Sequence, residues 1–179
     1  MITLLIFIVL VWAFYIGFSR GFLIQGAYTL WSLLALVVAT LFYKSLSPHL
    51  MLWVPYSNPT QDVTVHFFKS VSIFDLDHIY YASVGFLLIY VLVYVVGRLL
   101  GVFLHLIPSI KSLDKPLFDY LAGVLSLLVS AVSLSLCLAP LATVPLQSVQ
   151  TILSNSLLVR ILLDYFPGMT QLIHSLWIH

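Results

Sequence analysis

Charged side chains are scarce in this sequence. Only 7% of its 179 residues are charged: seven are Lys or Arg, and all six acidic residues are Asp. Because a soluble globular domain carries about 25% charged residues, this chain has too few of them to coat a soluble particle. Its net charge of +1 also gives no electrostatic support for a nucleic-acid partner, which needs clustered Lys and Arg. A composition that is 62% hydrophobic therefore predicts a protein surrounded by lipid.

Catalytic and metal-binding motifs are absent as well. The single cysteine, Cys137, excludes a disulfide framework within the chain and a cysteine-based zinc site. The sequence has no Gly-rich phosphate loop, no H-E-x-x-H motif and no G-x-S-x-G motif. No two of its histidines are four residues apart. We therefore expect no catalytic residues, no cofactor and no bound metal, and a protein that is not an enzyme.

What the sequence does contain is long apolar stretches. A membrane-spanning helix needs about 20 residues to cross about 30 Å of hydrocarbon. The stretches that meet this requirement are about residues 1–18, 22–42, 79–97 or slightly longer, and 117–138. They predict an all-α integral membrane four-helix bundle, a single domain over residues 1–179. The first stretch has no preceding basic residue and no small-x-small cleavage site after it, so we interpret it as a retained span.

A short polar corner, Gly17-Phe18-Ser19-Arg20-Gly21-Phe22, joins the first two stretches. Two long apolar runs joined by so short a corner predict a hairpin of membrane helices. Gly21 allows a tight turn or close packing. Arg20 offers a fixed charge to phospholipid headgroups or to helix carbonyl ends, although an ordinary basic flank explains this residue equally well.

Arg98 follows the third stretch and allows two placements. Residues 79–97 are long enough to cross the membrane by themselves, which favours Arg98 at the membrane edge. The alternative buries Arg98 in the membrane as a functional charge. The pair Gly97-x-x-x-Gly101 brackets this arginine and is typical of helices that approach each other closely.

The fourth stretch is rich in small residues. Asp119 lies near its start, and Gly123, Ser126, Ser130 and Ser133 follow at steps of three or four residues, so they share one helical face. In hydrocarbon such a face packs against another helix, because backbones can approach and hydroxyl groups can bond across the contact. A serine-lined pore is the alternative. We expect Pro140 and Pro145 to end this helix.

Three further segments predict short interfacial helices: residues 59–74 in the middle connection, and residues 149–166 and 169–178 in the C-terminal tail. Trp53, Tyr56 and Trp177 are candidate anchors at the lipid–water interface. For residues 59–74, packing on the bundle itself is an equally good interpretation. Residues 149–166 carry Arg160 and Asp164 one turn apart, which disfavours a membrane span.

Asp75, Asp77 and His78 close the middle connection. Two carboxylates and an imidazole could bind a divalent cation. The alternative, which we favour, is that Asp77 caps the third span and that the acidic side chains stabilise the positive end of its helix.

Basic residues give a weak prediction of orientation. The two short turns carry Arg20, Lys111 and Lys115, and Arg98 lies beside them. The other side carries Lys44, Lys69 and Arg160. Since cytoplasmic loops are enriched in Lys and Arg, this count places the short turns inside and both termini outside.

Several of these motifs resemble those of the colicin V production protein (CvpA) family. The pattern Gly17-x-x-Arg20-Gly21-Phe22 between the first two spans is similar to the signature of that family. Asp119-x-x-x-Gly123, which opens the last span after a Pro-containing turn, and the segment 156–167 are similar too. The family continues with small residues at four-residue steps, whereas this sequence has Leu127 and Ala131 there and serines one position earlier.

The resemblance implies a multi-pass protein of the inner (cytoplasmic) membrane that is required for colicin V production or export, and it transfers no catalytic residues. We therefore expect a non-enzymatic accessory protein in the lipid bilayer that binds other membrane or envelope proteins. The alternative is a subunit of a small channel or transporter. Four short spans form a narrow bundle, so a pore would need a homo-oligomer, with Arg98, Asp119 and the serine face along its path.

Overall fold

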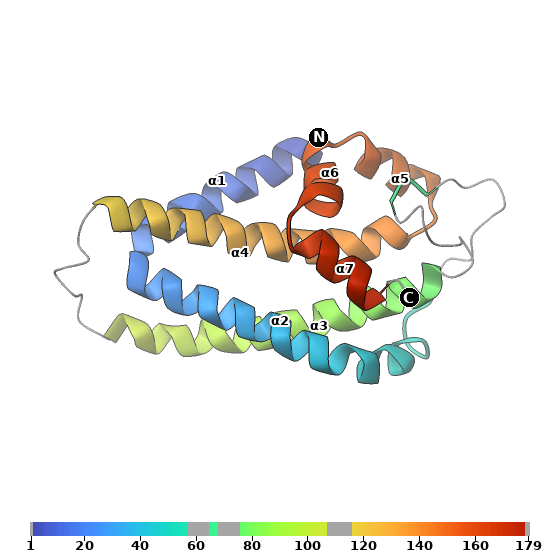
Figure 1. Ribbon diagram of the computed structural model, residues 1–179, viewed down its shortest axis with the longest axis horizontal. Helices are drawn as coiled ribbons and strands as arrows, with labels where there is room; N and C mark the ends of the chain where they lie inside the picture. Colours follow the sequence, from blue (N-terminus) through green and yellow to red (C-terminus); the bar gives the residue numbers. More distant parts are fainter. Residues whose placement is uncertain (1, 57–64, 68–75, 107–115, 178–179) are drawn as a thin grey trace.

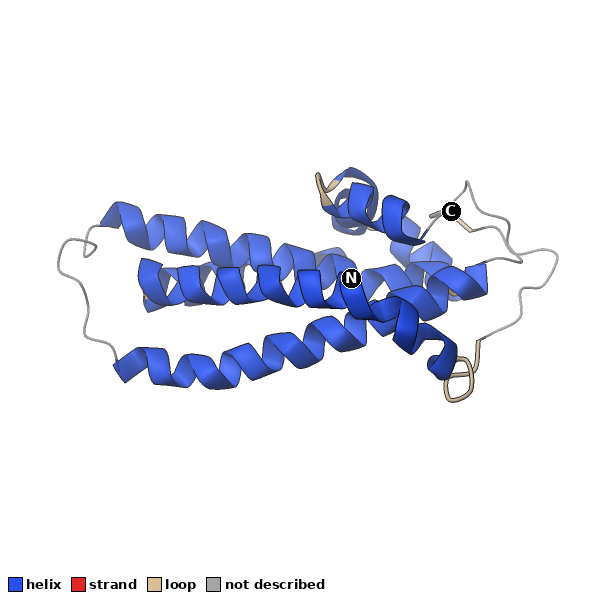
Figure 2. Cartoon of the chain, turned by 60° about the horizontal axis from the view of Figure 1, so that its bottom comes forward, coloured by secondary structure: helices blue, strands red, loops and turns tan. Residues whose placement is uncertain are grey.

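Four long helices lie side by side in one bundle in the computed structural model of the protein (Figure 1). The structure describes residues 2–56, 65–67, 76–106 and 116–177, and these form helices and short loops with no strands (Figure 2). The long helices are α1 (Ile2–Arg20), α2 (Phe22–Leu50), α3 (Leu76–Leu100) and α4 (Pro116–Thr143). By length and composition each could cross a membrane, α3 together with the start of the 3-10 helix η2 (Gly101–Leu106) that continues it. The predicted all-α fold with four candidate spans is confirmed.

Two of these helices extend through a proline. α2 continues past the predicted end at residue 42 and includes Pro48, and α4 includes Pro140 and ends at Thr143. The prediction that Pro140 ends the fourth helix is therefore wrong. A proline removes one backbone hydrogen bond, and in membrane helices neighbouring hydroxyl groups help to satisfy the freed groups. Here the Thr143 hydroxyl donates to the Pro140 carbonyl at 2.8 Å, and the helix ends before Pro145.

The bundle is built from two helix pairs. α1 packs mainly on α4 and α2 packs mainly on α3, while α4 also contacts α2 and α3. Ala35 and Ala39 of α2 are completely buried, as expected where small side chains let helices approach closely. The hydroxyl of Tyr90 on α3 forms hydrogen bonds with Ser32 of α2 (2.9 Å) and Ser133 of α4 (3.0 Å). One phenol therefore joins three helices.

The outer surface of the bundle is apolar. Leu4 of α1, Leu30 of α2 and Leu92 of α3 are 64–69% exposed. Soluble monomers rarely expose large continuous apolar patches, whereas lipid tails solvate leucine as well as a protein interior does. The outer surface of the bundle is therefore suited to a lipid bilayer, as in a membrane protein.

The C-terminal segment folds back onto the bundle (Figure 1). Its elements are α5 (Gln147–Ser154), α6 (Leu157–Arg160), the π-helical turn η4 (Ile161–Tyr165) and α7 (Met169–Trp177). The predicted helix over residues 149–166 is therefore divided into three elements. The hydroxyl of Ser135 on α4 donates to the Leu162 carbonyl at 2.9 Å, which fixes η4 against the bundle.

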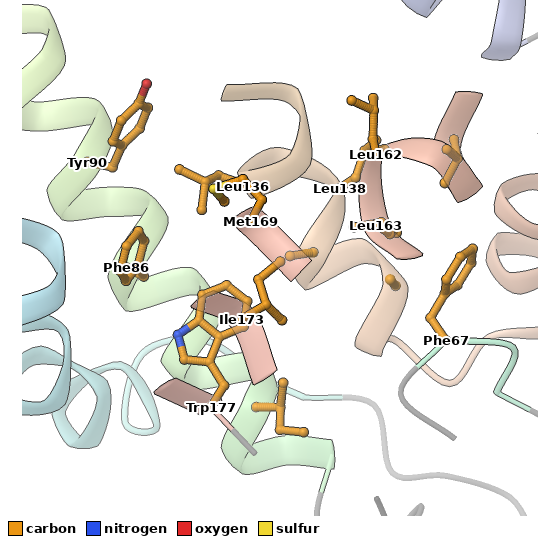
Figure 3. Packing of buried hydrophobic residues seen from close by; sticks show 14 of the residues in the cluster. Phe67, Phe86, Tyr90, Leu136, Leu138, Leu162, Leu163, Met169, Ile173 and Trp177 are labelled. Atoms are coloured by element: carbon orange, nitrogen blue, oxygen red, sulfur yellow. The ribbon is translucent and has the colours of Figure 1, made fainter. Parts of the chain in front are cut away.

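The amphipathic pattern of α7 is confirmed, but its apolar face contacts protein. Met169, Ile173 and Trp177 are at most 7% exposed, and Figure 3 shows them directed toward Phe86 and Leu136. The Trp177 indole meets the Phe86 ring edge-on, with centroids 5.7 Å apart. The prediction that Trp177 is an interfacial anchor is therefore wrong. An apolar stripe fits a lipid surface or a protein surface equally well, and here α3 and α4 supply the protein surface.

The middle connection is described only in part, so the predicted helix over residues 59–74 lies outside the described residues except for 65–67. Trp53 is 84% exposed, as an interfacial anchor would be. Tyr56 instead packs on the bundle: its hydroxyl donates to the Thr143 carbonyl at 2.9 Å, and its ring lies 5.1 Å from that of Tyr80. Burial and then the charge of Asp77 raise the pKa of Tyr56 to about 12, so it remains a neutral donor.

Asp77 lies in the first turn of α3, where a carboxylate stabilises the helix. Its carboxylate accepts a hydrogen bond from the backbone N–H of His78 at 2.8 Å. Asp75 lies outside the described residues. Within the part of the chain that the structure describes, no three acidic, histidine or cysteine side chains gather into a metal-binding group.

Candidate functional site

The corner between α1 and α2 consists of a single residue. Arg20 ends α1, Phe22 begins α2, and Gly21 between them has φ +82°. This left-handed conformation is strained for side chains with a Cβ and open to glycine. The space around Gly21 is empty within 4 Å, so the conformation of the backbone, and not crowding, requires glycine here. No side chain caps the first turn of α2.

Beside the corner, α1 and α4 approach each other through small residues. A Cβ at Gly17 would lie 2.6 Å from the Ala122 carbonyl oxygen and would overlap Ser126, and a Cβ at Gly123 would lie 2.7 Å from the Phe14 ring. The predicted small-residue face of α4 thus packs against α1 at Gly123 and Ser126. Ser130, one turn further along, is half-buried.

Two arginines from different helices meet on one tyrosine ring at this end of the bundle. The guanidinium carbon of Arg20 lies 5.3 Å from the centroid of the Tyr28 ring, and that of Arg98 lies 4.6 Å from it. Arg98 also lies 6.0 Å from the centroid of the Tyr94 ring. Distances within about 6 Å favour cation–π attraction. Because a helical side chain leans toward the helix N-terminus, Tyr28 on α2 leans toward the corner. We call Arg20, Tyr28, Tyr94 and Arg98 the arginine–tyrosine cluster.

Gly97 and Gly101 make room for rings and not for a neighbouring backbone. A Cβ at Gly97 would overlap the Trp31 indole, and one at Gly101 would overlap the Tyr28 ring. The Trp31 indole N–H donates to the Val93 carbonyl at 2.7 Å and so fixes this ring on α3. The predicted close approach at Gly97-x-x-x-Gly101 is therefore made by aromatic side chains of α2.

Comparison with known proteins identifies the family. Residues 2–167 match the family described as colicin V production protein. The chain belongs to this family. It is also similar to a Bacillus subtilis (strain 168) protein described as the uncharacterized transmembrane protein YshB, with 25% identity over 178 residues that cover 99% of this chain and 97% of that protein. No solved structure matches the chain significantly.

The family match includes the whole arginine–tyrosine cluster, whereas α7 begins after residue 167. Arg20, Gly97, Arg98 and Gly101 were candidates from the sequence. The structure brings Arg20, Arg98 and Gly101 together around Tyr28, while Gly97 lies against Trp31. Phe22 begins α2 at the corner, and its ring lies 5.4 Å from that of Phe118, the residue before Asp119 in α4. Although Asp119 is half-buried near this end, it forms no ion pair with the two arginines among the described contacts.

Sequence reasoning missed the α2 side of the site. Tyr28 and Trp31 lie three residues apart on α2. The Trp31 ring fills the gap left by Gly97 of α3, and the Tyr28 ring fills the gap left by Gly101 of η2. Gln25, the one strongly polar residue in its apolar run, is 2% exposed, and its side-chain amide oxygen Oε1 has no hydrogen-bond partner in the described part of the chain. The sequence does contain two aromatic residues at helical spacing and a Gly-x-x-x-Gly pair that could accommodate their rings. The spacing of residues within one helix, however, does not indicate which other helix packs against it.

A second polar feature is a cavity of about 260 Å³ among the C-terminal elements. It is lined by His66, Phe67, Ser154, Arg160, Asp164 and Tyr165. The Arg160 guanidinium donates from Nε to the Ser154 carbonyl at 2.7 Å, which ties α6 to α5. The Ser154 hydroxyl donates to the Thr151 carbonyl at 3.3 Å.

Proposed function

We propose that this member of the colicin V production protein family is a non-enzymatic accessory protein of the cell (cytoplasmic) membrane that binds other membrane or envelope proteins. Its membership of this family supports a function in the production or export of a toxin or bacteriocin and in the cell envelope. The observation that carries the proposal is that serine hydroxyl groups of the spans form hydrogen bonds inside the protein. Ser32 and Ser133 bond to Tyr90 of α3, and Ser135 bonds to Leu162 of η4. These three hydroxyl groups are therefore used inside the protein, while the outer face of the spans is apolar.

The partners of these hydroxyl groups also argue against catalysis. Ser133 bonds to a phenol and to the Val129 carbonyl, and Ser135 bonds to the Leu162 carbonyl. A serine nucleophile needs an adjacent base such as His or Lys, and in the described residues neither of these two serines has one among its hydrogen-bond partners. The hydroxyl groups instead join helices, as in membrane bundles generally.

Photo-crosslinking in native membranes tests the accessory function. A photoreactive amino acid is placed at the exposed positions Leu30 and Leu92, and at the fully buried Ala35 as the matched control. We expect the exposed positions to form reproducible adducts with other membrane or envelope proteins, while Ala35 yields only internal products. Gentle solubilisation and co-purification should then report the identity and stoichiometry of the same proteins. Recovery of lipid adducts alone would count against the proposal.

A channel or transporter subunit is the second candidate. It is supported by the meeting of Arg20 and Arg98 at one end of the bundle, because clustered charges near membrane spans often mark solute paths. Flux of ions and small solutes is measured in liposomes with and without the purified protein, and with Arg98→Gln. Flux that depends on Arg98 would favour this function, and no flux for any solute would remove it.

A further inference from the structure

The arginine–tyrosine cluster concentrates positive charge, and none of the described residues supplies a counter-charge to it. Arg20 and Arg98 are both half-buried, and both contact the buried ring of Tyr28. In the described part of the chain no carboxylate pairs with either guanidinium. Like charges in a partly desolvated setting repel each other, and an anion between or beside them removes that repulsion.

The surroundings of the cluster are apolar and open. Leu99, Val102 and Phe103, which follow Arg98 along α3 and η2, are 63–66% exposed. The cluster lies at the end of the bundle where the α1–α2 corner ends two candidate spans (Figure 1). The site therefore presents two guanidinium groups next to exposed hydrocarbon, and a ligand that matches it carries an anionic group attached to an acyl chain.

We propose that Arg20 and Arg98 bind the phosphate group of an anionic phospholipid, with Tyr28 holding the two guanidinium groups in place. The planar fork of arginine matches phosphate oxygens through two parallel hydrogen bonds. Gly101 is required because a Cβ there would displace the Tyr28 ring. A soluble phosphate shares this chemistry, but the exposed apolar side chains favour a lipid. The inference does not depend on the proposed accessory function.

Lipid retention tests the site. The full-length protein is placed in phosphatidylcholine nanodiscs with or without phosphatidylglycerol and re-extracted in mild detergent, and bound lipids are counted by native mass spectrometry. We expect the wild type to retain phosphatidylglycerol preferentially. Arg20→Gln and Arg98→Gln should each weaken retention about fivefold, as expected for loss of one basic contact at a membrane surface. Arg98→Lys should retain more lipid than Arg98→Gln, because lysine keeps the positive charge, although it lacks the planar guanidinium group that forms two parallel hydrogen bonds.

Lys44→Gln is the matched control. Lys44 also lies over a tyrosine ring, 5.9 Å from the centroid of Tyr43, but near the other end of α2, and no second basic residue among those the structure describes lies over that ring. This variant should retain phosphatidylglycerol as the wild type does. Melting temperature and elution volume are measured for every variant, so that loss of lipid is distinguished from misfolding.

A parallel arm adds excess inorganic phosphate to the wild type and to R20Q/R98Q. If inorganic phosphate does not displace the bound lipid, the ligand is a phospholipid. If it displaces lipid from the wild type but not from the double variant, the two arginines bind phosphate, and the natural ligand is a soluble phosphate. A wild type without preference for phosphatidylglycerol overturns the proposal, whatever the variants do. Equal retention by a well-folded R20Q/R98Q also overturns it. If the wild type shows no lipid preference but binds another protein in a way that depends on Arg20 and Arg98, the proposal is overturned in favour of an acidic protein partner.

Discussion

At the scale of residues, the glycines of this protein serve different physical purposes. Gly21 supplies a left-handed backbone conformation in open space, whereas Gly97 and Gly101 make room for the rings of Trp31 and Tyr28. Gly26 does neither: it lies inside α2 with nothing within 4 Å of its missing Cβ. The position of a glycine in a sequence motif therefore does not reveal what the glycine does, and substitution distinguishes these roles.

Gly97→Ala should destabilise the protein. The added methyl group would overlap the Trp31 indole, which cannot move away without losing its bond to Val93. We expect the free energy of unfolding to fall by about 1–3 kcal/mol, as for other overpacked cores. Gly26→Ala is the matched control, and should raise the free energy of unfolding by up to about 1 kcal/mol. Thermal unfolding in detergent measures both. Similar shifts for the two variants would contradict the packing of Trp31 on Gly97.

At the scale of elements, α7 is an amphipathic helix. Its sequence pattern does not indicate whether its apolar face contacts lipid or protein. Its apolar residues Met169, Ile173 and Trp177 complete the core between α3 and α4 (Figure 3). The Tyr43 hydroxyl donates to the Leu176 carbonyl at 2.7 Å and so attaches the same helix to α2. We infer that the C-terminal helix stabilises the bundle.

Trp177→Ala should therefore lower the free energy of unfolding by about 3–5 kcal/mol, the usual effect of removing a large aromatic ring from a core. Trp53→Ala is the control, because Trp53 is 84% exposed and substitutions at exposed positions usually change stability by about 0.5 kcal/mol or less. Melting temperature and limited proteolysis of the C-terminal segment report the effect. Equal stability of the two variants would show that α7 does not pack on the bundle in the membrane.

At the scale of the whole molecule, four candidate spans place the α1–α2 corner and the middle connection at opposite ends of α2 (Figure 1). This arrangement predicts that Ser19 and Trp53 lie on opposite sides of the membrane. Ser19 and Trp53 are both exposed, so each position is accessible to a reagent. The distribution of basic residues further predicts that the corner is inside.

Cysteine labelling tests this topology in a Cys137→Ala background. Ser19→Cys should react with a membrane-impermeant maleimide only after the cells are permeabilised, whereas Trp53→Cys should react in intact cells. Reversed labelling would keep the four spans and invert the orientation. Labelling of both positions from the same side would contradict α2 as a membrane span.

The sequence by itself determined that the protein is apolar enough for lipid, that it is all-α and that it has four candidate spans, because apolar length and the scarcity of charge are local properties. It also placed Gly97, Arg98 and Gly101 near one another, since they are close in the chain. The structure alone decided that Arg20 and Arg98 share the ring of Tyr28, and that Trp177 meets Phe86 instead of lipid. These contacts depend on which helix faces which, and an apolar helix carries the same pattern whether lipid or protein covers it.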